Sequence, residues 1–171
     1  QASPMHDVGK IGIPDSILLK PGKLEAGEWD IMKTHSAIGA DILGDPDSNL
    51  LRLARSIALS HHEKWDGSGY PMGLKYEDIP LEGRITAVCD VFDALTSDRP
   101  YKDAWPVAKA IRFINDNSGS HFDPRLVTAF NEILPKILAI REKYADTDRE
   151  DQNDPFLAFS IGYRSTVPSP A

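Results

Sequence analysis

The sequence predicts a single all-α domain, and three observations lead to that prediction. Apolar residues recur mostly at helical spacing, and no segment shows a convincing alternation of polar and apolar residues. The chain has 171 residues, of which 41% are hydrophobic and 26% charged, and this suits one globular domain that buries a core without disulfides. Residues 65–80 are rich in glycine, proline and polar side chains, so we expect a helical bundle with one long loop between helices.

The first half of the chain is expected to contain two long helices. Residues 25–43 predict one helix, whose core-facing stripe at i, i+4 and i+7 spacing consists of Ile31, His35, Ile38 and Ile42. His35 should therefore point inward. The next helix should be capped near Asp47 or Ser48 and end at about His62, and the residues that share its buried face are Leu50, Ala54, Ile57 and His61.

Three further helices are expected after the loop. The first should run from near Pro80 to about Thr96, with a narrow face of small residues around Asp90 that lets another backbone or a bound group come close. The others are expected near 105–117 and 124–145, and Asp123 and Pro124 are typical of the start of the last one. Pro135 should kink or divide that helix. We expect a domain over residues 1–145 and an acidic, proline-containing tail over 146–171.

Composition excludes several classes of function. The net charge of −7 argues against nonspecific binding to DNA or other nucleic acids, although metal ions and a few basic side chains can still make one pocket positive. The apolar runs are too short to cross a bilayer, so no membrane contact is expected of this domain. Cys89 is the single cysteine, which rules out a disulfide framework and a thiolate-rich zinc site and favours a cytoplasmic location.

Three of the five histidines fall in two compact polar signatures. In the first, His6 and Lys10 should lie one turn apart near a helix end with Asp7 beside them. A carboxylate in that position can bridge two metal ions, and the lysine can then reach a phosphate that those ions hold. The alternative is a helix C-terminus at which a histidine and a lysine meet the helix dipole, and taken alone this interpretation is the better one.

The second signature opens with the adjacent histidines His61 and His62. On a helix their side chains diverge, so they could reach two neighbouring ions. An isolated inward histidine, whether His61 or His35, is more often a hydrogen-bonded core residue than a metal ligand. Inward histidines and acids on several separate helices all need partners, however, and one shared metal cluster would satisfy them together. The pattern therefore favours an imidazole and carboxylate site for iron, manganese or zinc.

The third helix adds two aspartates one turn apart. Asp90 faces the small-residue groove and is the better ligand candidate, whereas Asp93 is expected to orient a ligand from behind. Arg99 and Lys102 follow at the helix end, where contact with a phosphate and simple pairing with the helix dipole are equally consistent with the spacing. His121 is expected to be structural or at the rim of the site.

These residues resemble the HD-GYP domains, a bacterial group within the HD phosphohydrolase superfamily. The longest matching motifs are His-Asp-Val-Gly-Lys-Ile-Gly-Ile-Pro-Asp from His6 and His-His-Glu-Lys-Trp-Asp-Gly-Ser-Gly-Tyr-Pro from His61. The isolated His35 also matches, as do Asp-Val-Phe-Asp-Ala-Leu-Thr from Asp90 and Asp-Arg-Pro-Tyr-Lys from Asp98. The similarity covers about residues 1–145, and an ungapped signature as long as the second is highly specific.

The resemblance implies an all-helical phosphodiesterase that hydrolyses cyclic di-GMP to linear pGpG or to GMP. Two divalent ions, iron or manganese, would be held by His6, Asp7, His35, His61, His62 and Asp90, with Asp7 bridging. Lys10 would contact the scissile phosphate, Arg99 and Lys102 would bind the nucleotide, and the loop Gly69-Tyr70-Pro71, with the Tyr70 side chain, would shape the pocket and could contact a partner protein.

Family members carry helices before the His-Asp motif, some of which complete a third metal position. The present chain starts five residues before His6, so we expect it to be a fragment that follows an N-terminal receiver or sensor domain. Two other functions remain open at this point. One is a metal-containing receptor that binds cyclic di-GMP without hydrolysing it and acts through partners. The other is a hydrolase of a different nucleotide, which the intact Gly-Tyr-Pro signature disfavours.

Overall fold

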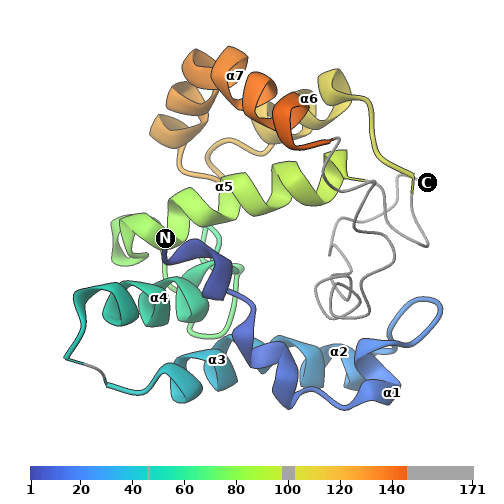
Figure 1. The fold of residues 1–171 in the computed structure, drawn as a ribbon, viewed down its shortest axis with the longest axis vertical. Helices are drawn as coiled ribbons and strands as arrows, with labels where there is room; N and C mark the ends of the chain where they lie inside the picture. Colours follow the sequence, from blue (N-terminus) through green and yellow to red (C-terminus); the bar gives the residue numbers. More distant parts are fainter. Residues whose placement is uncertain (46, 98–102, 146–171) are drawn as a thin grey trace.

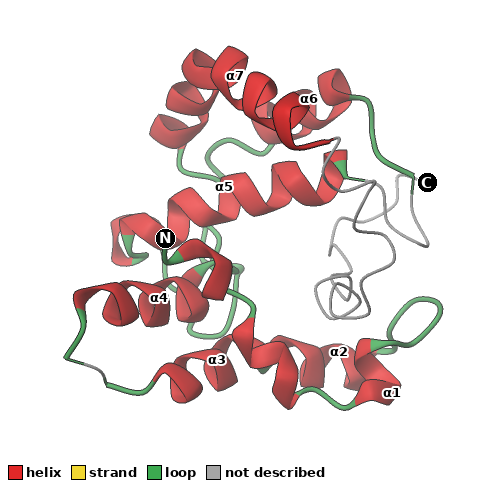
Figure 2. Cartoon of the chain, in the orientation of Figure 1, coloured by secondary structure: helices red, strands yellow, loops and turns green. Residues whose placement is uncertain are grey.

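The computed structural model describes residues 1–45, 47–97 and 103–145, and within these ranges every regular element is helical (Figure 2). The α-helices are α1 (Asp15–Leu18), α2 (Ala26–Lys33), α3 (His35–Leu43), α4 (Asn49–Ser60), α5 (Leu81–Thr96), α6 (Val107–Asp116) and α7 (Pro124–Ala145). Three short 3-10 helices are η1 (Ser3–Met5), η2 (Val8–Gly12) and η3 (Tyr76–Asp78). The all-α prediction is confirmed. The expected tail over 146–171 lies outside the described residues.

Helix α5 runs through the middle of the bundle. It packs against α6 and α7 on one side and against α4 on the other, with α3 and η2 lying beyond α4 (Figure 1). The largest apolar cluster lies on the α6 and α7 side, and its most buried members are Val88, Leu95, Ala110, Ile114 and Phe122. None of the helices in the part of the chain described above combines the length and the apolar character that crossing a membrane would take.

The single helix expected over 25–43 is two helices that meet at Thr34. In a continuous helix, the Met32 carbonyl oxygen would accept a hydrogen bond from the Ser36 N–H. Here it accepts one from the imidazole Nδ1–H of His35, at 2.7 Å. This break rotates the predicted stripe, so Ile31 and Ile42 are exposed although His35 is buried as expected. The prediction was wrong here because a side-chain bond to the backbone leaves no mark on the periodicity.

Helices α4 and α5 approach each other closely. Gly83 is the reason, because a Cβ atom at that position would overlap the Ser60 side chain. Ala54 and Ala58 on α4 are completely buried, which confirms the inward face predicted for that helix, whereas Leu50 at its start is exposed. The small-residue face of α5 therefore brings the α5 backbone against the C-terminal end of α4.

The last helix begins as the sequence predicts. Asp123 is buried, and its Oδ1 accepts the backbone N–H of Arg125 at 2.9 Å. Its Oδ2 accepts a bond of 2.7 Å from Arg84, which ties the start of α7 to α5. Helix α7 continues through Pro135 from residue 124 to residue 145, so the proline does not divide it.

The N-terminal segment lies directly on helix α3. A Cβ atom on Gly9 would overlap the carbonyl oxygen of His35 and the backbone nitrogen of Gly39, so η2 and α3 touch backbone to backbone. Contact this close is open only to glycine. It sets the distance between the turn that contains His6 and Asp7 and the start of α3.

Replacing Gly9 tests this contact. Gly9→Ala should lower the free energy of unfolding by at least about 2 kcal/mol, because the added methyl group must push two backbone segments apart. Gly27→Ala is the matched control, since nothing lies within 4 Å of its added Cβ in helix α2. That control should be neutral or stabilising by up to about 1 kcal/mol. Chemical denaturation measures both, and equal stability of the two variants would contradict the close approach.

Candidate metal centre

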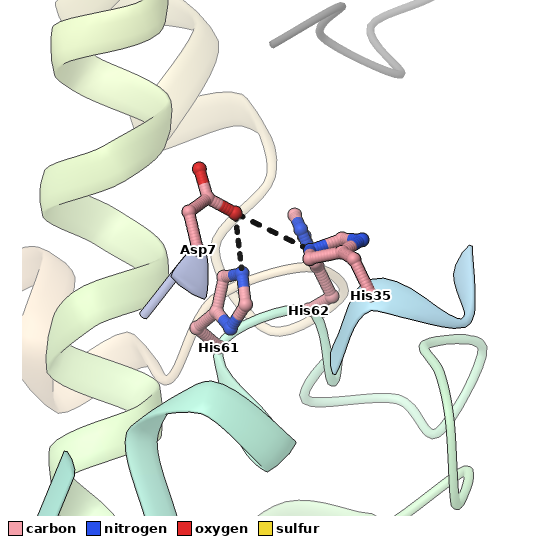
Figure 3. A group of neighbouring side chains, drawn as sticks. All are labelled: Asp7, His35, His61 and His62. Atoms are coloured by element: carbon pink, nitrogen blue, oxygen red, sulfur yellow. Dashed lines mark ion pairs between the residues drawn. The ribbon is translucent and has the colours of Figure 1, made fainter. Parts of the chain in front are cut away.

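Four ligand-type side chains from separate segments meet at one point (Figure 3). Asp7 lies in the turn between η1 and η2, His35 is the first residue of α3, and His61 and His62 directly follow α4. One ligand atom from each of the four lies within 4.8 Å of the others. The Asp7 Oδ1 atom is 3.3 Å from Nε2 of His35 and 3.7 Å from Nε2 of His61. The predicted convergence of distant stretches is therefore present.

Helix ends orient three of the imidazoles. His6 Nδ1 bonds to the Ser3 carbonyl at 2.7 Å, and His35 Nδ1 bonds to the Met32 carbonyl at 2.7 Å. His61 Nδ1 lies 3.0 Å from the Ala58 carbonyl. A carbonyl oxygen only accepts, so each Nδ1 carries the proton, and in the neutral ring Nε2 keeps a lone pair. Each histidine thus satisfies a carbonyl in the last turn of the preceding helical segment and turns Nε2 toward Asp7.

The second oxygen of Asp7 faces a different group. Asp7 Oδ2 is 3.2 Å from Nε2 of His6 and forms an ion pair with Lys10, whose side chain is buried. The same His6 nitrogen lies 3.7 Å from Oδ1 of Asp90 on α5. His6 and Lys10 reach Asp7 from 3-10 turns and not from the end of an α-helix, which corrects the expected local structure but keeps the grouping.

The Nε2 atoms of neutral His35 and His61 face the carboxylate oxygen Oδ1 of Asp7, and all three atoms are hydrogen-bond acceptors. Asp7 Oδ1, His35 Nε2 and His61 Nε2 are all shielded from solvent and have no hydrogen-bond partner among the described residues. Buried polar atoms in such a state are costly, and two facing acceptors repel unless a cation lies between them. A divalent ion satisfies all three atoms, and imidazole nitrogen with carboxylate oxygen suits iron, manganese and zinc. The residues therefore fit a divalent metal ion.

The pKa values of the acids follow from the same contacts. Burial raises the pKa of the Asp7 carboxyl, but the three histidines beside it and the charge of Lys10 together outweigh that effect, so the pKa lies well below its usual value. Burial, with the charge of Asp7 nearby, raises the pKa of Asp90. Asp7 is thus the permanently charged group at the centre.

The histidines differ in their pKa values. Burial lowers the pKa of His62 well below its usual value, and the neighbouring His61 and His35 lower it further. Burial also lowers the pKa of His61, although Asp7 opposes this. His6 is the exception, because the hydrogen bond and charge of Asp7 and the charge of Asp90 outweigh its burial and raise its pKa. His61 and His62 are therefore ready to bind a cation at neutral pH, whereas protons compete for His6.

The glycine-rich loop forms one wall of the site. The Tyr70 ring stacks on His62 with 4.7 Å between centroids, and burial followed by the charges of Asp7 and Asp90 raises the pKa of its hydroxyl. Buried Glu63 holds the loop, since its carboxylate accepts the backbone N–H groups of Met72 at 2.7 Å and Leu74 at 3.1 Å. Sequence reasoning gave Glu63 no role, although its place directly after two histidines was the available signal.

Not every predicted site residue joins the cluster. The side chains brought together are His6, Asp7, Lys10, His35, His61, His62, Tyr70 and Asp90. Asp93 is exposed and accepts a hydrogen bond from Ser97, which directly follows its helix, so the expectation that it orients a ligand was wrong. Arg99 and Lys102 lie outside the described residues. His121 stacks on Phe122, in keeping with a structural role.

Known proteins with similar sequences carry related names. A family model described as HD domain matches residues 1–126. A cyclic di-GMP phosphodiesterase of Thermotoga maritima is 50% identical over 160 residues, which cover 90% of this chain and 44% of that protein. The 3′3′-cGAMP-specific phosphodiesterase 2 of Vibrio cholerae is 51% identical over 145 residues, which cover 85% of this chain and 28% of that protein.

A solved structure confirms the fold. The crystal structure of a cyclic GMP-AMP-specific phosphodiesterase of Vibrio cholerae matches with a TM-score of 0.58 at 22% identity, over 91% of this chain and 42% of that one. The chain spans less than half the length of the relatives named here. With the family model covering most of its length and relatives at half identity, the chain belongs to the HD-domain family, in the HD-GYP group.

Proposed function

We propose that this chain is the catalytic domain of a metal-dependent phosphodiesterase that hydrolyses cyclic di-GMP to pGpG, to GMP or to both. The observation that carries the proposal is the buried carboxylate of Asp7 facing the Nε2 atoms of His35 and His61. Relatives at about half identity are named as phosphodiesterases of cyclic di-GMP or of 3′3′-cGAMP, so a cyclic dinucleotide is the substrate class that they support.

Six residues would hold two divalent ions. The two oxygens of Asp7 suggest which residues would bind which ion, because Oδ1 faces His35 and His61 while Oδ2 faces His6. We assign His35, His61 and His62 to one ion and His6 with Asp90 to the other, with Asp7 bridging. Iron or manganese is proposed, since a set of nitrogen and oxygen ligands suits either. A third position would need a ligand from a preceding segment.

The surrounding residues would prepare the substrate. When bound, divalent ions would lower the pKa of a coordinated water molecule and would stabilise the negative charge on phosphate oxygens. Lys10, held beside Asp7, places an ammonium group where it can pair with a phosphate and stabilise growing negative charge. Tyr70 closes the site over His62 and keeps its proton, so it can donate a hydrogen bond. Arg99 and Lys102 are proposed to bind the nucleotide.

The proposed setting is bacterial signalling in the cytoplasm. An N-terminal receiver or sensor domain and a protein partner at the loop Gly69-Tyr70-Pro71 are part of the proposal. Partial exposure of that loop makes such a contact accessible. The acidic net charge supports the absence of DNA among the partners.

Turnover by the full-length protein tests the proposed activity. Anaerobic protein loaded with iron or manganese should release pGpG or GMP from cyclic di-GMP, and chromatography of the products measures this. A parallel reaction with 3′3′-cGAMP compares the two substrates that the relatives' names suggest. Tight binding of cyclic di-GMP with no product from either nucleotide would reject the enzyme and favour the receptor.

Metal content tests the ligand assignment. His61→Ala and Asp7→Ala should each lose most of the bound metal while keeping the helical fold, because the main apolar core lies around α5, α6 and α7. Asp93→Ala is the matched control, since Asp93 is exposed on the same helix as Asp90 and should retain its metal. Elemental analysis and circular dichroism make the comparison, and full metal content in both site variants would refute the assignment.

Metal affinity should rise with pH because of His6. The pKa of His6 is raised, so near neutral pH a metal ion must displace its proton, whereas the pKa values of His61 and His62 are lowered and these rings are already neutral. We expect the affinity for Mn²⁺ to increase up to about tenfold per pH unit while His6 titrates. His6→Ala should bind more weakly and lose this pH-dependent step. Competition titrations at several pH values measure it, and an unchanged slope in the variant would exclude His6.

Lys10 should act on the substrate and not on the metal. Lys10→Ala is expected to keep its metal and to slow turnover by roughly 10²–10³-fold, which is typical of losing one group that stabilises transition-state charge. Lys10→Arg keeps the charge and should retain part of the activity. Elemental analysis and steady-state kinetics separate the two effects. A variant that lost its metal would instead show that Lys10 supports the site structurally.

A further inference from the structure

A pocket of about 260 Å³ lies away from the metal ligands and is lined mainly by helix α4. Arg52, Arg55 and Ser56 come from that helix, and Met72 from the glycine-rich loop. Pro80, which precedes α5, and Asp45, which follows α3, complete the lining named here. None of these residues takes part in the cluster around Asp7, so the pocket is separate from the site described above.

Arg55 is the unusual residue of this pocket. Its side chain forms no ion pair with an acid of residues 1–45, 47–97 or 103–145. Its Nε atom is shielded from solvent and has no hydrogen-bond acceptor within the same ranges. A guanidinium group presents five donors and stays charged at all physiological pH values. Shielding the Nε–H donor without an acceptor is costly, and the half-buried Arg55 side chain also lines the adjoining cavity.

The rest of the lining favours a negatively charged occupant. Arg52 lies three residues from Arg55, so both guanidinium groups share one side of α4. Of the described residues that line the pocket, Asp45 is the one acid, and it forms no ion pair with Arg55. Two arginines against one aspartate make the local charge positive on a chain whose net charge is −7. The Ser56 side chain adds a hydroxyl donor at the same wall.

We propose that this pocket binds the phosphate group of a small ligand, independently of the metal centre. The planar fork of Arg55 matches two phosphate oxygens, and a second arginine suits the double charge of a phosphate better than the single charge of a carboxylate. The pocket shares Met72 with the loop that covers the metal site, and the Met72 N–H is held by Glu63, next to His62. A ligand in the pocket would therefore contact the same loop that carries Tyr70 at the metal site.

Calorimetric titration with inorganic phosphate tests this inference on the metal-loaded protein. Phosphate should bind at two kinds of site, one at the metal centre and one at the arginine pocket. His61→Ala should remove the first and keep the second. Arg55→Gln should keep the first and weaken the second at least tenfold, and Arg55→Lys should weaken it less because the charge stays while the fork is lost.

Arg112→Gln is the matched control for Arg55→Gln. Arg112→Gln changes the net charge equally at an exposed position on α6 and should leave both sites intact. Identical phosphate binding by the Arg55→Gln and Arg112→Gln variants would overturn the proposal, as would a complete loss of phosphate binding in His61→Ala.

A nucleoside 5′-monophosphate used in place of phosphate identifies the source of the ligand. Equal affinity would assign the pocket to free phosphate, and at least tenfold tighter binding that still depends on Arg55 would assign it to a nucleotide. Because the arginine site is measured in His61→Ala, which has no metal centre, its failure is distinguishable from failure of the proposed hydrolase activity.

Discussion

The close approach of η2 to helix α3 is the contact on which the site depends. Glycine at positions 9 and 39 lets two backbones touch, and this places the Asp7 carboxylate 3.3 Å from His35 Nε2. With any larger side chain between the segments, the carboxylate would be held away from the imidazoles. The position of the acid that gives the centre its permanent charge thus depends on the absence of side chains at Gly9 and Gly39, in addition to its ion pair with Lys10.

Helix termini supply the second constraint. His6, His35 and His61 each donate Nδ1–H to a backbone carbonyl in the turn before them. That one hydrogen bond fixes the tautomer and aims the opposite nitrogen at Asp7. Because the bonds are to backbone, the ligand geometry depends on where each helix stops. At the break at Thr34, the Met32 carbonyl accepts the Nδ1–H of His35, which is buried at the start of α3.

The loop after α4 connects the metal centre with the arginine pocket. Buried Glu63 takes two backbone N–H groups of the loop, and burial raises its pKa although those bonds oppose the shift. Tyr70 and Met72 lie two residues apart and contact different sites, one against His62 and the other at the pocket with Arg55.

The sequence by itself determined the helical class, the bounds of α4 to α7 to within a few residues, and the chemical type of the site, because periodicity and residue type are local properties of the chain. It did not determine that Asp7 faces His35 and His61 with one oxygen and His6 with the other, that Asp93 turns away, or that residues 25–43 form two helices. These outcomes depend on how closely separate backbones pack and on which carbonyl a side chain reaches. Such distances exist only once the helices are assembled, and so only the tertiary structure decided them.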